Sequence, residues 1–199
     1  MEVHFIRSGA RRYSMRIERA GLPTLVMDPA PGFDADVPHD MVHFVVEAVL
    51  GLKGGVFGQI AAGGTAGSFH VEAASGKADA REQRRTVRKQ VAKGKKLIEG
   101  QGREGELSEL AAFLLDIGWR SANRPDGAER RAALGEAARV RRTLSDGEQA
   151  AIDAARPAVF AAFDALAAQW RALRVGEALV LEWPTLRRIS DAASRTRSP

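Results

Sequence analysis

The hydrophobic period of the sequence changes along the chain, and this change restricts the possible folds more than any other feature. Near the N-terminus, Tyr13, Met15 and Ile17 alternate with polar residues, which is the pattern of a strand with one buried face. From Ser145 onward, apolar residues recur every three or four positions, as they do along one face of a long helix. Strand-type and helix-type segments are thus segregated, and the sequence predicts an α+β fold.

The expected architecture is a small antiparallel sheet, made of an N-terminal hairpin and a C-terminal strand, packed with four to five helices. The strands of the hairpin are expected at residues 2–7 and 13–19, and the C-terminal strand at 178–183. The main helices are expected at residues 38–50, 79–99, 106–121, 127–142 and 145–175.

The length and composition of the chain narrow its class further. With 199 residues and no visible repeat or linker, we expect one α+β domain over residues 1–186 and a flexible tail over residues 187–199. The chain has no cysteine, so a metal site would need histidine and carboxylate ligands. No segment resembles a signal peptide or a membrane span, and we expect a soluble cytoplasmic protein with no membrane partner.

The clearest candidate for chemistry is the helix that carries His39, Asp40, His43 and Glu47. At positions i, i+4 and i+8, the two histidines and Glu47 share one face, and Asp40 lies at its edge. Two imidazoles one turn apart can bind one metal ion, and a carboxylate completes a ligand set that leaves a position for water.

We therefore expect His39, His43 and Glu47 to bind a divalent metal ion, zinc by preference, in a metal-dependent hydrolase. Asp40 would accept a proton or orient a ligand. The alternative interpretation is that these residues form the solvated or structural polar face of an ordinary amphipathic helix.

The segment from His39 to His43 reads His-Asp-Met-Val-His and resembles two zinc motifs. One is the H-E-x-x-H motif of the zincins, with Asp40 in place of the glutamate. The other is the H-D-x-x-H motif of the ubiquinone-biosynthesis Coq protein family, in which a glutamate follows after eleven residues; that position is Gly55 here, and the nearest polar candidate is Gln59. Both resemblances imply zinc at the two histidines, and each covers only a small part of the chain.

The basic pI comes from one segment, residues 77–99, which has nine lysines and arginines and three acidic residues. An alternative function is therefore non-enzymatic binding of nucleic acid, an anionic ligand or an acidic partner. The candidate contacts are Arg81, Arg84, Arg85, Arg88 and Lys89. The segment contains no aromatic residue for base stacking. A third possibility is a structural module whose long helices pair in a homodimer.

Overall fold

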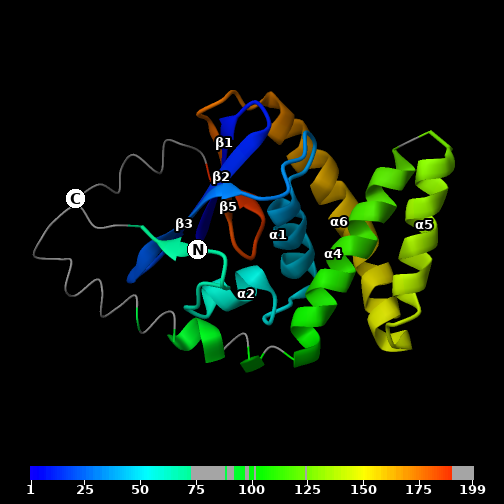
Figure 1. Ribbon diagram of the computed structural model, residues 1–199, viewed down its shortest axis with the longest axis horizontal. Coiled ribbons are helices and arrows are strands. Elements are labelled where there is room, and N and C mark those ends of the chain that lie inside the picture. Colours follow the sequence, from blue (N-terminus) through cyan, green and yellow to red (C-terminus); the bar gives the residue numbers. More distant parts are fainter. Residues whose placement is uncertain (73–87, 89–91, 97–98, 101, 124, 190–199) are drawn as a thin grey trace, which may run out of the picture.

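The computed structural model describes residues 1–72, 88, 92–96, 99–100, 102–123 and 125–189, and it has the expected α+β class (Figure 1). The strands are β1 (Glu2–Gly9), β2 (Arg12–Arg19), β3 (Leu22–Ala30), β4 (His70–Val71), β5 (Ala178–Glu182) and β6 (Arg187–Arg188). The helices are α1 (His39–Leu50), α2 (Val56–Ala61), α4 (Gly102–Ala122), α5 (Ala128–Arg141) and α6 (Asp146–Ala172).

The six strands form one antiparallel sheet in the order β4-β3-β2-β1-β5-β6. The expected pairing of the N-terminal hairpin with a C-terminal strand is confirmed, because β1 lies between β2 and β5. Phe5 of β1 is opposite Met15 of β2 on one side and Leu179 of β5 on the other. All three side chains are buried, so the alternation of each strand directs one apolar face to the same core.

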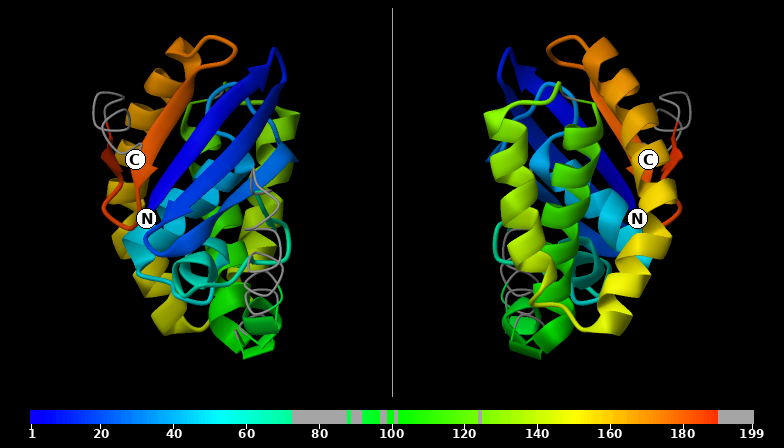
Figure 2. Two further views of the ribbon diagram at one scale, coloured as in Figure 1. Left: turned by 90° about the vertical axis from the view of Figure 1, so that its left-hand side faces the viewer. Right: turned by 90° about the vertical axis from the view of Figure 1, so that its right-hand side faces the viewer.

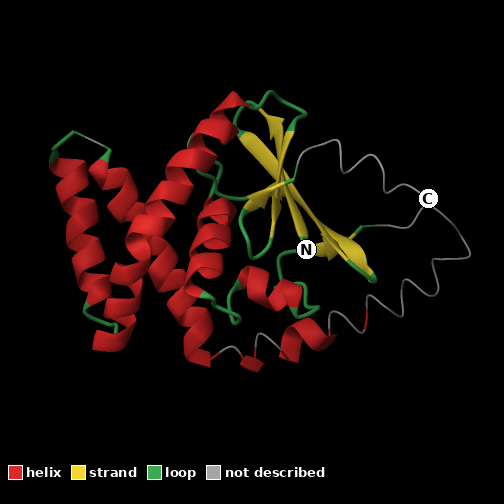
Figure 3. Cartoon of the chain, turned by 180° about the vertical axis from the view of Figure 1, so that it is seen from behind, coloured by secondary structure: helices red, strands yellow, loops and turns green. Residues whose placement is uncertain are grey.

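The helices cover one face of this sheet (Figures 2 and 3). α1 lies next to the sheet, where Phe44 meets Phe5 edge-on with ring centroids 5.6 Å apart. On its other sides α1 contacts α2, α4 and α6, and α5 packs outside against α4. Every residue of α1 from Asp40 to Glu47 is therefore buried. The polar side chains of Asp40, His43 and Glu47 therefore face neighbouring elements of the protein, whereas His39, at the start of α1, is exposed.

Several element boundaries differ from the expected ones. The sheet extends into the segment assigned to the tail, since β6 pairs with β5, while residues 190–199 lie outside the described part of the chain. Strand β4, at the edge of the sheet, is only two residues long. The long helix α6 begins with a capping box formed by Ser145 and Glu148, and Pro157 lies inside the helix without ending it. Among the described residues, no helix is long and apolar enough to cross a bilayer.

The loop before α1 is held by Asp34. Its Oδ1 accepts hydrogen bonds from the backbone N–H groups of Asp36 and Val37 at 2.8 and 3.0 Å. Its Oδ2 lies 2.9 Å from Nη1 of Arg120 on α4. In the same loop, Asp36 pairs with Arg171 of α6 at 2.7 Å. These ion pairs connect the loop to α4 and α6 immediately before the chain enters α1.

Replacing Asp34 by asparagine is expected to lower the free energy of unfolding at pH 7 by about 1 kcal/mol, after allowance for solvent screening of this half-buried group. Burial raises the pKa of Asp34, but the N–H donors of Asp36 and Val37 and the Arg120 guanidinium together bring it below its usual value. A carboxylate with a lowered pKa in the folded state stabilises the protein above its unfolded pKa, and this contribution disappears as the pH falls through the folded pKa. Urea unfolding at several pH values should show the gap between wild type and variant shrinking below about pH 4. A gap that stays constant down to pH 2 would contradict this role.

Candidate functional site

The four polar residues of α1 have different surroundings. Asp40, His43 and Glu47 are buried, with 9%, 3% and 0% of their surface exposed, whereas His39 is exposed. Within the described part of the chain, the ligand atoms of His39, His43 and Glu47 do not lie within 4.8 Å of one another as a set of three. Metal binding by the original set of three therefore stays a prediction, and each residue has to be considered through its own contacts.

The carboxylate of Glu47 caps the short helix α2. Its Oε2 accepts hydrogen bonds from the N–H groups of Phe57 and Gly58 at 2.9 and 3.3 Å. Its Oε1 accepts from the N–H of Val56 at 2.8 Å and from the Ser108 hydroxyl of α4 at 2.9 Å. The first N–H groups of a helix have no acceptor within the helix. A negative charge at this end also interacts favourably with the positive end of the helix dipole. Glu47 thus joins α1, α2 and α4 at one buried point.

Gly55 explains how the carboxylate of Glu47 can approach the start of α2 so closely. A Cβ atom at Gly55 would lie only 2.2 Å from Cδ of Glu47, a separation that real structures do not show. Any side chain at position 55 would displace the carboxylate from the N–H groups of α2. Gly55 occupies the position at which the Coq motif has a glutamate. In this chain, the contact between Glu47 and α2 requires a residue without a side chain at that position.

His43 lies between two carboxylates. Its Nδ1 is 3.7 Å from Oε1 of Glu47, and its Nε2 is 3.6 Å from Oε2 of Glu109 on α4. Neither separation is a normal hydrogen bond, and Nδ1 has no hydrogen-bond partner among the described residues. Burial lowers the pKa of His43, but Glu47, Glu109 and Asp40 outweigh it and raise the pKa above its ordinary value. The ring of His39 is the next neighbour, with centroids 4.7 Å apart.

Asp40 contacts β2 through Tyr13. The Tyr13 hydroxyl forms a short hydrogen bond with Oδ2 of Asp40 and lies 2.6 Å from the carbonyl oxygen of Pro31. Burial raises the pKa of Asp40, although Tyr13, His39 and His43 oppose the change. Because a carbonyl can only accept, a protonated Asp40 would let Tyr13 donate to Pro31 while accepting from the carboxyl group. Asp40 thus anchors α1 to the sheet, and its expected catalytic role stays a prediction.

A cavity of about 320 Å³ lies beside Glu109, where α2 meets the first turns of α4. Its walls are mostly small or backbone groups, with two carboxylates. The lining residues are Gly54, Gly55, Val56, Gln59, Ala66, Gly102, Gly105, Glu106 and Glu109. Sequence reasoning missed Glu109, because it stands on the polar side of an ordinary amphipathic helix and no spacing connects it with the histidines. Only the tertiary packing of α1 against α4 brings it to His43.

Among the described residues, the three side chains whose possible metal-ligand atoms do lie close together are on the sheet, and they form a weak metal site. Glu2, His4 and Glu18 offer ligand atoms within 4.8 Å of one another on β1 and β2. However, Oε1 of Glu18, which lies 3.6 Å from Nε2 of His4, is already in a short ion pair with Arg16. An arginine in contact with the same oxygen competes with a metal ion for that charge. These three residues are therefore not a convincing metal site.

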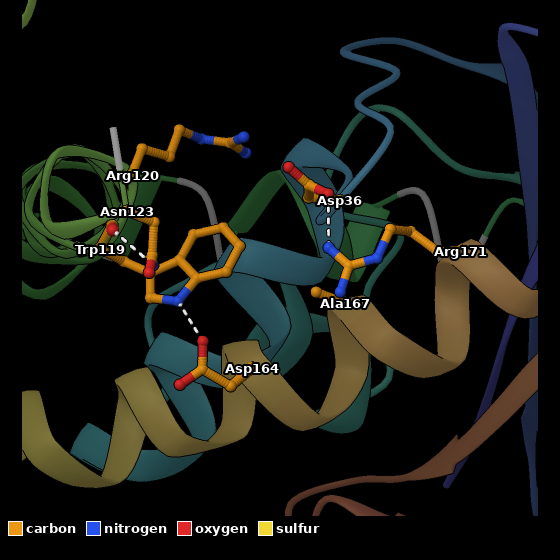
Figure 4. A pocket seen from close by; sticks show the side chains of 7 residues that line it. All are labelled: Asp36, Trp119, Arg120, Asn123, Asp164, Ala167 and Arg171. Carbon is orange, nitrogen blue, oxygen red and sulfur yellow. Dashed lines mark hydrogen bonds and ion pairs between the residues drawn. The ribbon is translucent and has the colours of Figure 1, made fainter. Parts of the chain in front are cut away.

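A larger cavity, of about 430 Å³, lies between α4, α6 and the loop before α1 (Figure 4). Its charged lining groups are paired within the protein. Trp119 donates its indole N–H to Asp164 at 2.8 Å, and Arg171 donates to Asp36 at 2.7 Å. Arg120 binds Asp116 and also Asp34, as described above. These contacts connect α4, α6 and the loop before α1 with one another, and they do not point to a ligand.

The basic segment can be followed only in part. Arg81, Arg84, Arg85 and Lys89 lie outside the described residues, whereas Arg88 is described, helical and exposed. Binding of nucleic acid or of an acidic partner through this segment stays a prediction, as does pairing of the long helices in a homodimer.

Comparison of the chain with protein-family models, with curated proteins and with solved structures finds no match. The candidate site is therefore interpreted from its own geometry.

Proposed function

We propose that this protein binds a divalent metal ion between His43 and Glu109, with His39 as a third ligand. The observation that carries the proposal is the 3.6 Å separation of His43 Nε2 and Glu109 Oε2. It is too long for a good hydrogen bond. It is close to the roughly 3.3 Å that separates two ligand atoms bound to one tetrahedral zinc ion.

Two further contacts of His43 support this assignment. Glu47 lies behind the ring, on the Nδ1 side, and metal-binding histidines commonly have a carboxylate there that orients the imidazole. His39 is next to His43 on the same helix, and its exposed ring is free to turn toward a bound ion. In this arrangement Glu109 takes the ligand position first expected for Glu47, whose oxygens are engaged by α2 and Ser108.

Hydrolysis is the reaction class that such a ligand set favours. Two histidines and one carboxylate leave a coordination position for water, and a divalent ion lowers the pKa of that water toward neutrality. The adjoining cavity beside Glu109 provides space for a small substrate. Asp40 lies on the same helix but is bonded to Tyr13, and in this proposal it holds α1 in position.

Titration calorimetry with zinc tests the proposal, using untagged protein from which metal has been removed. We expect one ion per chain, and we expect His43→Gln and Glu109→Gln each to weaken binding at least about 100-fold, because losing a residue that merely orients a ligand already costs roughly 10–100-fold. His70→Gln and Glu136→Gln, which change exposed residues of β4 and α5, are matched controls that should bind zinc as the wild type does. Wild-type protein that binds no zinc, or control variants as weak as the site variants, would refute it.

A further inference from the structure

The cavity beside Glu109 has the size of a site for a small ligand. Its volume of about 320 Å³ is at the lower end of the range for ligand pockets and equals roughly ten water molecules. The loop before α2 closely approaches α4 and limits the width of the cavity, since a Cβ atom at Gly54 would lie 3.2 Å from the backbone nitrogen of Gly105. This space accommodates a substrate with a few functional groups.

Two carboxylates line this cavity. Glu106 and Glu109 are the charged side chains among its described lining residues. Arg103 contacts Glu106 at 2.8 Å, but it also binds Glu148 through two nitrogens at 2.7 and 2.9 Å. The side chains of Arg103, Glu106 and Glu148 together therefore carry one net negative charge. Glu109 adds a second negative charge. The start of α4 contributes only about half a positive charge through its helix dipole, so the carboxylates prevail.

The buried imidazole of His43 connects this cavity with the proposed metal site. His43 is almost completely buried, and its Nε2 faces Glu109, whose side chain also lines the cavity. Glu109 is therefore shared: its side chain lines the cavity and also faces the nitrogen that we assign to the metal ion. A divalent ion would offset the charges of Glu109 and Glu47, and the group of Arg103, Glu106 and Glu148 would still be negative.

We propose that this cavity binds a small substrate that carries a positively charged amine and that it excludes carboxylates and phosphates. Glu106 would receive the ammonium group at its Oε1, because Arg103 contacts its Oε2 and Glu106 lines the cavity without contacting His43. The position of the substrate beside a metal ion rests on the proposed function, whereas the size and charge of the cavity do not depend on it. The two proposals can therefore fail separately.

Amide NMR spectra of the full-length protein, labelled with 15N, test this inference with three probes of similar shape: benzylamine, benzamide and benzoate. We expect benzylamine to shift the amide signals of Gly54, Gly55 and Gly105, and benzoate to bind at least tenfold more weakly, with benzamide between them. Glu106→Gln should weaken benzylamine binding at least threefold, and Glu136→Gln should not change it. Benzoate binding as tightly as benzylamine, or an unchanged benzylamine affinity in Glu106→Gln, would overturn the inference.

The same titrations are made on metal-free and on zinc-loaded protein. Benzylamine binding at the glycines in a protein that takes up no zinc would support the amine site and refute the metal site. Zinc uptake without any shift of the glycine signals would support the metal site and refute the amine site.

Discussion

Replacing Glu47 by alanine is expected to lower the free energy of unfolding by about 4 kcal/mol, which is a large part of the stability of a single domain. The carboxylate is completely buried and accepts hydrogen bonds from three N–H groups of α2 and from Ser108. Alanine would leave these four donors in the core without their acceptor. An unsatisfied buried donor costs about 1–3 kcal/mol, so the loss of several outweighs the relief of removing a buried charge.

Urea unfolding followed by circular dichroism measures this loss. Glu109→Ala is the matched control, since Glu109 also contacts His43 but has 65% of its side chain exposed, and its change should stay below about 1 kcal/mol. Gly55→Ala should be destabilising as well, because its Cβ would collide with the Glu47 carboxylate. If Glu47→Ala unfolds within 1 kcal/mol of the wild type, the carboxylate is not what holds α2 in place.

The second large effect is expected at Trp170, whose replacement by alanine should cost about 3–5 kcal/mol. Trp170 is fully buried near the end of α6, and its ring packs edge-on against Tyr13 with centroids 6.1 Å apart. Its indole N–H donates to the carbonyl oxygen of Asp34 at 3.0 Å. The substitution would leave a cavity between α6 and the sheet and an unsatisfied carbonyl in the loop before α1.

Thermal and urea unfolding of three variants separate these contributions. Trp170→Phe keeps most of the buried ring but loses the bond to Asp34, so it should cost roughly 1–2 kcal/mol. Val175→Ala, at a residue with 60% exposure just beyond α6, should change stability by less than about 0.5 kcal/mol. A Trp170→Ala protein as stable as Val175→Ala would show that α6 is not anchored through this ring.

The sequence predicted the parts of the fold that depend on local pattern. The alternation at Tyr13, Met15 and Ile17 marks a strand with a buried face, and the capping box at Ser145 and Glu148 marks the start of a helix. Both features depend only on residues that are close together in the chain. The C-terminal strand was also expected to join the N-terminal hairpin, and β5 does pair with β1.

The candidate site was harder to predict, because its partners are either backbone groups or distant residues. Helical spacing placed His39, His43 and Glu47 on one face, and this suggested a single ligand set. In the fold, each turn of α1 meets a different neighbour: Asp40 contacts β2, His43 contacts α4, and Glu47 contacts α2 and α4. Backbone N–H groups such as those of α2 have no signature in a sequence, and neither has the approach of Glu109.

The most direct test of the proposed metal site is the 15N NMR spectrum of the imidazole rings before and after one equivalent of zinc. The chain has only four histidines, so each ring can be assigned by a single substitution. The proposal predicts that the nitrogen signals of His43 and His39 shift, with Nε2 as the bound atom of His43, while those of His4 and His70 stay unchanged. A zinc-dependent shift at His4 instead, or at none of the four rings, would contradict it.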